Sequence, residues 1–208
     1  MLKIGRIVMG ICSTNCYFLY EEGKNQVIFV DPADRGDVLY DKLTQAGFEV
    51  AGIILTHGHF DHIWGLQKLK ELTGVKVYAY EGEKEILGDV IKNLSAEFGR
   101  PCTVDADVYL KDGEEVTIAG MTCKMIATPG HTIGGCCYYF EKDGILISGD
   151  TLFEESIGRT DFVTGSMSEL VRSVKEKLFV LPDDTKVYPG HGGETSIGHE
   201  KKYNPFCR

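Results

Sequence analysis

A six-residue run, His57-Gly58-His59-Phe60-Asp61-His62, follows directly after a segment with the composition of a buried strand, 51–56. Only six of the 208 residues are histidines, so three of them in six positions are improbable by chance. In an extended loop, residues i and i+2 point to the same side, so His57 and His59 can face one cation. A turn at Asp61 and His62 can direct the carboxylate and the third imidazole toward a second cation. The chain must therefore fold into a rigid scaffold that holds this strand end beside further ligands.

Three more loops of the same kind occur at predicted strand ends. They are TPGHT at 128–132, SGDT at 148–151 and PGHG at 189–192, which contribute His131, Asp150 and His191. Together with the first run they supply five imidazoles and two carboxylates. This set is sufficient for two sites of three ligands each with one shared carboxylate, and it suits zinc, iron(II) or manganese. His199 lacks such a loop, and we expect it to be an ordinary surface residue.

The hydrophobic pattern predicts alternating strands and helices along the whole chain. The N-terminal strands should form an antiparallel meander, and each half of the chain should combine strands with helices. Residues 82–103 are expected to form one or two helices that end at Pro101. Strands are expected at 3–9, 15–20, 26–32, 51–56, 75–80, 115–119, 121–127, 135–140, 144–149 and 186–189, and helices at 37–45, 63–72 and 168–180. This pattern favours an α+β protein of a single domain, 1–208, with two sheets packed face to face and helices outside.

Composition excludes several classes of protein. The chain has 22 Lys plus Arg against 31 Asp plus Glu, a formal charge of −9, which argues against binding nucleic acid through phosphate contacts. No segment approaches the about 20 apolar residues of a membrane span, and the N-terminus lacks the apolar core of a signal peptide. The seven scattered cysteines suit free thiols better than a disulfide framework. We therefore expect a cytoplasmic protein with no membrane or nucleic-acid partner.

The four loops, in this order and spacing, resemble those of the metallo-β-lactamase superfamily over essentially the whole chain. The resemblance implies a four-layer αββα sandwich with a dinuclear site at one edge of the sheets. It also implies two divalent metal ions, with zinc favoured and iron or manganese as alternatives. Carried over residue by residue, it assigns metal 1 to His57, His59 and His131, metal 2 to Asp61, His62 and His191, and the bridging position to Asp150.

Within the superfamily, SIGRTDF at 156–162 and GHGGETSIGHEKKYNPF at 190–206 resemble the glyoxalase II-like hydrolases, especially their short bacterial branch. These enzymes are thioesterases of hydroxyacyl-glutathione and related small-molecule substrates. The resemblance implies that a hydroxide bound between the metals attacks the thioester carbonyl and that Asp61 is catalytic. Asp150 stands where the zinc β-lactamases have a cysteine ligand, so antibiotic hydrolysis is not expected.

The same resemblance assigns Arg159 to substrate binding, because glyoxalase II-type enzymes carry a basic residue near the glutathione. A structural ion pair of Arg159 with Asp161, Glu154 or Glu155 is the alternative. Two differences from the longer glyoxalase II-type enzymes argue against glutathione as the thiol of the substrate. Asp161 replaces a tyrosine of those enzymes, and no C-terminal helical domain is expected beyond Arg208.

Other activities are compatible with the same motifs. Persulfide dioxygenases share GRTDF and use one iron at the metal 1 triad, whereas PGHGG at 189–193 favours a hydrolase. A lactonase and a metal-binding protein without turnover are further alternatives. The oligomeric state is not predicted.

Overall fold

Two six-stranded sheets form the framework, and the computed structural model describes residues 1–207. The first sheet has the strand order β1-β2-β3-β4-β5-β6. Its strands are β1 (Leu2–Met9), β2 (Thr14–Glu21), β3 (Gln26–Val30), β4 (Glu49–Ile54), β5 (Val77–Tyr80) and β6 (Val108–Leu110). The predicted antiparallel meander, β1 to β3, is confirmed, and β4, β5 and β6 extend the sheet in parallel.

The second sheet has the order β14-β13-β10-β9-β8-β7. Its strands are β7 (Glu115–Ile118), β8 (Met121–Ala127), β9 (Cys136–Phe140), β10 (Ile145–Gly149), β13 (Lys186–Pro189) and β14 (Thr195–Ser196). Because β9 is antiparallel to both β8 and β10, and β10 is parallel to β13, the strands β8, β10 and β13 all run in one direction. A small hairpin of β11 (Leu152–Phe153) and β12 (Ser156–Ile157) follows β10.

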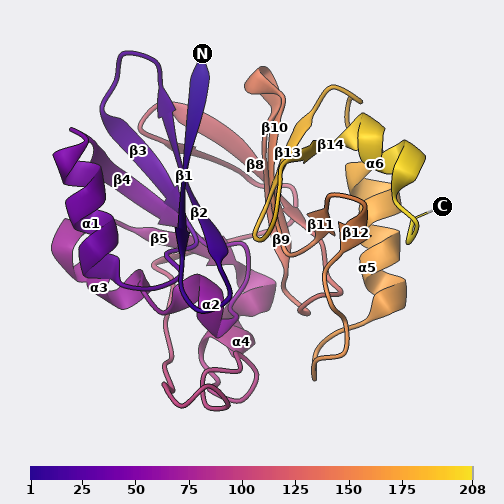
Figure 1. The fold of residues 1–208 in the computed structure, drawn as a ribbon, viewed down its shortest axis with the longest axis horizontal. Helices are drawn as coiled ribbons and strands as arrows, with labels where there is room; N and C mark the ends of the chain where they lie inside the picture. The colour runs from indigo at the N-terminus through magenta and orange to yellow at the C-terminus, as the bar shows by residue number, and fades with distance from the viewer. Residues whose placement is uncertain (208) are drawn as a thin grey trace.

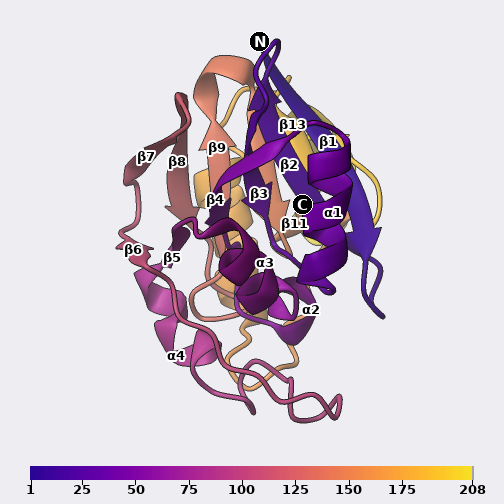
Figure 2. The same ribbon diagram turned by 90° about the vertical axis from the view of Figure 1, so that its left-hand side faces the viewer.

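Helices cover the outer faces of both sheets, so the layers run helix, sheet, sheet, helix (Figure 1). The helices α1 (Gly36–Gln45) and α3 (Leu66–Thr73) lie across the first sheet, as Figure 2 shows. The second sheet is covered by α5 (Met167–Ser173), its π-helical continuation Val174–Leu178, and α6 (Ile197–Tyr203). The prediction of a single-domain, four-layer αββα sandwich is confirmed.

Apolar side chains from both inner faces fill the space between the sheets, among them Leu19, Ile28, Tyr138 and Phe140. Tyr138 is fully buried, and its hydroxyl donates a hydrogen bond to the carbonyl of Leu55 at 3.0 Å. The same strand end is joined to the second sheet by a main-chain bond from Cys136 to the carbonyl of Thr56 at 2.9 Å. The ends of β4 and β9 are therefore fixed together at one edge of the sandwich.

Two helical predictions were wrong in extent. The segment 82–103 contains only a 3-10 turn (Glu81–Glu83) and the short helix α4 (Lys84–Leu87), followed by turns. The helix predicted over 63–72 is interrupted at Gly65, between α2 (Phe60–Ile63) and α3. A Cβ at Gly65 would lie 2.8 Å from the carbonyl oxygen of Asp34, so the close approach of two main chains requires a glycine there.

Several short elements were not predicted, among them β6, β11, β12, β14 and α6. The helix α6 is signalled only by Ser196, whose side chain accepts a hydrogen bond from the amide of His199 as an N-cap. Within residues 1–207, every helix is too short or too polar to cross a lipid bilayer.

Truncation of Leu69 tests how α3 is attached to the first sheet. Leu69 is completely buried whereas Leu72, on the same helix, is 40% exposed. We expect Leu69→Ala to lower the free energy of unfolding by about 2–5 kcal/mol because it leaves a cavity, and Leu72→Ala by less than about 1 kcal/mol. Urea denaturation of both variants measures the difference, and equal losses would contradict this packing.

Candidate metal centre

The side chains predicted as metal ligands leave four strands at one edge of the sandwich. The first four follow β4, two in the loop and two on the single turn of α2. The others follow β8, β10 and β13. The structure brings all of them into three overlapping groups whose ligand atoms lie within 4.8 Å of one another: His57, His59 and His131; His57, His62 and Asp150; and Asp61, His62 and His191.

The first group consists of His57, His59 and His131, which are all buried. Nδ1 of His59 lies 2.9 Å from Nε2 of His131. Nε2 of His57 is buried and has no hydrogen-bond partner among the residues that the structure describes. Imidazole nitrogens that converge in this way match the donor set of a zinc or iron site.

The second group consists of Asp61, His62 and His191. Nε2 of His191 lies 3.3 Å from Oδ2 of Asp61 and 3.4 Å from Nε2 of His62. The hydroxyl of Thr14, on β2, donates a hydrogen bond to the same Oδ2 at 3.1 Å, which fixes the carboxylate. Two imidazoles and one carboxylate therefore face a common point.

Asp150 lies between the two groups and reaches both. Its Oδ2 is 3.6 Å from Nε2 of His131 and 3.4 Å from Nε2 of His191, and its Oδ1 is 3.4 Å from Nε2 of His62. Oδ1 is buried and has no hydrogen-bond partner among residues 1–207. The position of Asp150 is the one that a carboxylate shared by two cations would occupy.

These residues fit divalent cations by a simple physical test. Buried nitrogen and oxygen atoms without partners are costly, and native structures rarely tolerate several of them side by side. Here Nε2 of His57, Nε2 of His59 and Oδ1 of Asp150 are such atoms. Cations bound among His57, His131 and Asp150 would compensate the carboxylates and the imidazole lone pairs. The groups can thus hold metal, and the individual ligand roles remain predictions.

The second nitrogen of three imidazoles is occupied by the protein. Nδ1 of His62 is 2.9 Å from Oδ2 of Asp31, Nδ1 of His131 is 2.8 Å from the carbonyl of Arg159, and Nδ1 of His191 is 3.1 Å from the carbonyl of Cys12. Such contacts orient each ring and leave Nε2 free for a cation. Asp31 also accepts hydrogen bonds from the amide and hydroxyl of Thr56 at 2.8 and 2.6 Å.

Asp31 and Glu83 also belong to the site, although the sequence did not predict either of them there. Asp31 follows a buried strand directly, as Asp150 does, and this placement could have signalled it. No sequence pattern marked Glu83 as part of the site, because it lies in the segment that was expected to be helical. Its carboxylate accepts hydrogen bonds from the amide of Gly58 at 2.7 Å and the hydroxyl of Thr132 at 3.0 Å, so it ties two ligand-bearing loops together.

Burial and charge act in opposite directions on the histidines. Burial, with the charge of His131, lowers the pKa of His59 to about 3. At His191 burial also lowers the pKa, but hydrogen bonds to Asp150 and Asp61 outweigh it and raise the pKa to about 9. A proton on His191 thus partly offsets the two carboxylates at neutral pH. A cation would replace that proton, so metal binding should release protons.

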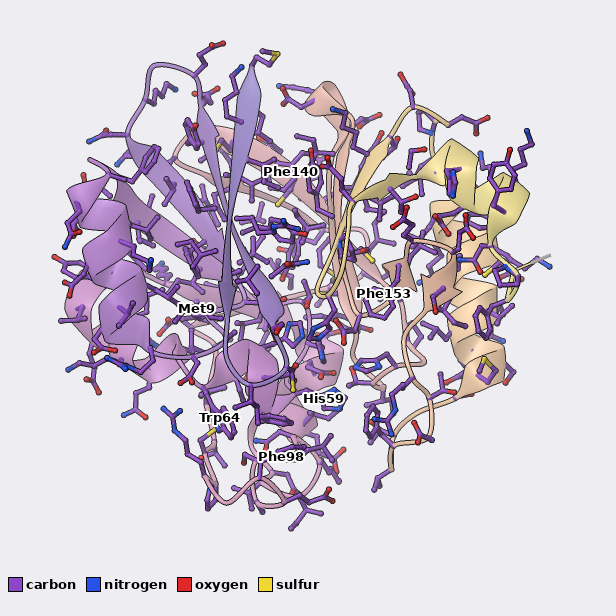
Figure 3. The ribbon with its side chains drawn as sticks, viewed as in Figure 1. Met9, His59, Trp64, Phe98, Phe140 and Phe153 are labelled. Carbon is purple, nitrogen blue, oxygen red and sulfur yellow. The ribbon has the colours of Figure 1, made fainter. Side chains whose placement is uncertain are left out.

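A cavity of about 360 Å³ opens at the carboxylates of the centre. Its other walls are largely apolar and come from the segment after α4, the β11–β12 hairpin and the loop that follows it. Figure 3 shows His59 between Phe98 and Phe153. The apolar residues that line the cavity are Phe60, Leu94, Phe98, Phe153 and Phe162.

Arg159 lies at the rim of this cavity, and the structure shows one of its two predicted alternatives. Its guanidinium donates two hydrogen bonds to the carboxylate of Asp161 at 3.0 and 2.8 Å and lies 4.7 Å over the ring of Phe162. The ion pair is exposed, with 71% of the Arg159 side chain accessible. A role of Arg159 in substrate binding remains a prediction, whereas its carbonyl holds His131.

His199 lies on α6, outside the centre. Its Nε2 is 3.1 Å from a carboxylate oxygen of Glu155, and its ring packs on Tyr203. All seven cysteines are free thiols, as composition suggested, and Cys12 is the one that lines the cavity.

Gly190 tests how tightly the two groups are packed. A Cβ at this position would lie 2.2 Å from Oδ1 of Asp150 and 2.7 Å from Cε1 of His62. We expect Gly190→Ala to weaken metal binding by about 10- to 100-fold, as loss of an orienting contact does. In the matched variant Gly193→Ala the new Cβ meets only the flexible side chain of Glu154 at 3.3 Å. Metal per chain after dialysis is the measurement, and equal retention by both variants would contradict the geometry.

The stability of the metal-free protein should depend on pH through Glu83. Burial raises its pKa from 4.5 to about 7, against the hydrogen bonds from Gly58, Thr132 and Gly134. Between these values the native state keeps a proton that the unfolded chain has lost, so stability falls as pH rises. Relative to Glu83→Gln, wild type should lose roughly 3 kcal/mol at most between pH 4.5 and 7. Urea denaturation across this window measures it, and a constant difference would contradict the raised pKa.

Comparison with known proteins agrees with this geometry. Residues 9–191 match the sequence profile of the metallo-beta-lactamase superfamily. The probable metallo-hydrolase YqgX of Bacillus subtilis is 36% identical over 99% of this chain and 97% of its own. Hydroxyacylglutathione hydrolase GloC of Haemophilus influenzae is 32% identical over 92% of each chain.

Solved structures show the same similarity. BLEG-1, described as a B3 metallo-beta-lactamase, has a TM-score of 0.92 and 36% identity over 99% of each chain. TTHA1623 in a di-iron-bound form has a TM-score of 0.85 and 27% identity, covering 97% of this chain and 99% of its own. For ETHE1 from Myxococcus xanthus the TM-score is 0.81 and the identity 29%, covering 98% and 83%. The chain therefore belongs to the metallo-β-lactamase superfamily.

Proposed function

We propose that this metallo-hydrolase is a thioesterase of the glyoxalase II type that acts on small-molecule thioesters. The observation that carries the proposal is the position of Asp150, whose carboxylate lies within 3.6 Å of His62, His131 and His191. Two adjacent sites with one shared carboxylate are the arrangement needed for hydrolysis by a two-metal centre. The similarity to hydroxyacylglutathione hydrolase GloC over 92% of both chains supports the same reaction class.

In this proposal His57, His59 and His131 hold one cation, Asp61, His62 and His191 hold the second, and Asp150 contacts both. Zinc is favoured, with iron or manganese as alternatives. When bound, the cations would lower the pKa of a water molecule and polarise the substrate carbonyl.

Asp61 is suited to orient the attacking water molecule. Its carboxylate lines the cavity and accepts a hydrogen bond from the hydroxyl of Thr14 at 3.1 Å, which restrains its orientation at the cavity wall. A water molecule in the cavity can donate a hydrogen bond to this carboxylate. A thiolate leaves without a strong general acid, which agrees with the largely apolar walls around the carboxylates.

A mononuclear iron dioxygenase that acts on persulfides is the second candidate. In this candidate a single iron would be held by the metal 1 triad of His57, His59 and His131, whose imidazoles converge in the structure. Lactonase activity is a further alternative within the hydrolases. Because the similar BLEG-1 is described as a B3 metallo-beta-lactamase, β-lactams belong in the same substrate panel.

The panel separates these candidates in one experiment. Zinc-, iron- and manganese-loaded protein is assayed with S-lactoylglutathione and other thioesters, a lactone, a β-lactam, and glutathione persulfide with oxygen uptake. We expect thioester hydrolysis without oxygen consumption. One iron per chain with oxygen consumption on the persulfide would instead establish the dioxygenase.

Substitution of Asp150 tests the shared carboxylate. Asp150→Ala should lose at least one metal per chain and at least about 100-fold in kcat/KM for the best thioester, because both groups lose a ligand. His199→Ala, on α6 and away from the centre, should stay close to wild type in both measurements. Unchanged metal content and unchanged activity in Asp150→Ala would refute the two-metal proposal.

A further inference from the structure

We propose that the centre acts on thioesters with an apolar acyl chain, and that Phe60, Leu94 and Phe98, here called the apolar wall, bind that chain. The inference rests on the proposed thioesterase activity. In that reaction the carbonyl carbon gains a C–O bond to water, the C–S bond breaks, and the thiol leaves with one proton from that water.

The apolar wall offers an accessible aromatic face beside the metal ligands. The rings of Phe60 and Phe98 stack with centroids 4.1 Å apart and an interplanar angle of 26°. Phe60 is buried, whereas Phe98 is 49% exposed and lines the cavity. Phe98 and His59 line the same cavity, so a chain that extends from the centre along the cavity can reach this ring.

Leu94 is held in the wall by its main chain. Its φ of +66° lies in the left-handed region, which a leucine rarely adopts. Asn93 imposes this conformation: its carbonyl accepts from the amide of Phe60 at 2.9 Å, and its side chain bonds the amide of Ser95 at 2.9 Å and the carbonyl of Cys102 at 2.8 Å. The wall is thereby tied to α2, the helix that carries Asp61 and His62. A fixed apolar surface beside a reactive centre selects substrates by their apolar groups.

The charged side chains around the cavity also favour a substrate with an apolar acyl chain. Within residues 1–207, each basic side chain on the segments that border the cavity already has a carboxylate partner: Arg159 with Asp161, Lys92 with Glu85, and Arg100 with Asp34. A thiol that carries carboxylates, such as glutathione, would have to share one of these cations with the carboxylate that already pairs with it. An apolar acyl chain needs none, and its burial against the wall is favourable.

The test varies the acyl chain on a neutral thiol. Metal-loaded protein is assayed with N-acetylcysteamine thioesters from acetyl to octanoyl, and with S-lactoylglutathione. We expect kcat/KM to rise about fourfold per methylene until the wall is covered, and octanoyl-N-acetylcysteamine to exceed S-lactoylglutathione. The octanoyl-to-acetyl ratio should fall about tenfold in Phe98→Ala. It should not change in Ile91→Ala, since Ile91 is an exposed residue of the same segment that does not line the cavity.

Binding of stable S-alkyl thioethers of N-acetylcysteamine to the metal-free protein, measured by calorimetry, gives an independent readout. Affinity should increase with chain length in wild type and in Ile91→Ala, but not in Phe98→Ala. Thioester hydrolysis without dependence on chain length, or a preference for S-lactoylglutathione, would overturn this inference alone. Chain-length-dependent binding without hydrolysis of any thioester would instead overturn the proposed thioesterase activity.

Discussion

The structure depends on one demanding arrangement: imidazole nitrogens and carboxylate oxygens face each other in a buried place, and some of them lack a hydrogen-bond partner within residues 1–207. In the described part of the chain, residues 1–207, Nε2 of His57 and Oδ1 of Asp150 have no hydrogen-bond partner. Such atoms are tolerable only if every loop that carries them is fixed from behind. Asp31, Glu83 and the carbonyl of Cys12 do this work, each contacting a ligand-bearing loop from outside the centre.

The loop that carries His191 is fixed by three hydrogen bonds from one residue, Asn15. Asn15, on β2, donates its side-chain amide to the carbonyls of Pro189 and Gly192 at 2.9 and 3.1 Å. Its main-chain amide donates to the carbonyl of Gly190 at 2.7 Å. One residue of the first sheet thus shapes the turn that presents His191. The first sheet therefore supplies both ligands and the support for a ligand of the second.

The sequence predicted the sandwich and the convergence of the ligands because both depend on local patterns. Apolar runs mark the strands, and glycine-containing loops mark their ends. The irregular path of 88–107 could not be predicted in this way, because main-chain hydrogen bonds such as that from the amide of Phe60 to the carbonyl of Asn93 depend on distant partners. The same limit applies to Arg159. Residue type indicated a side-chain role, whereas the structure shows that its carbonyl orients His131 and its guanidinium pairs with Asp161.

The two sheets come from successive halves of the chain, the first from residues up to Leu110 and the second from Glu115 onward. Neither half holds a full complement of ligands. His57, His59, Asp61 and His62 belong to the first half, and His131, Asp150 and His191 to the second. Any cation at this edge therefore joins the halves, and its binding free energy opposes their separation by mass action. A bound metal would link the two sheets. A partial separation of the sheets would remove some of its ligands and release the metal before either sheet unfolds.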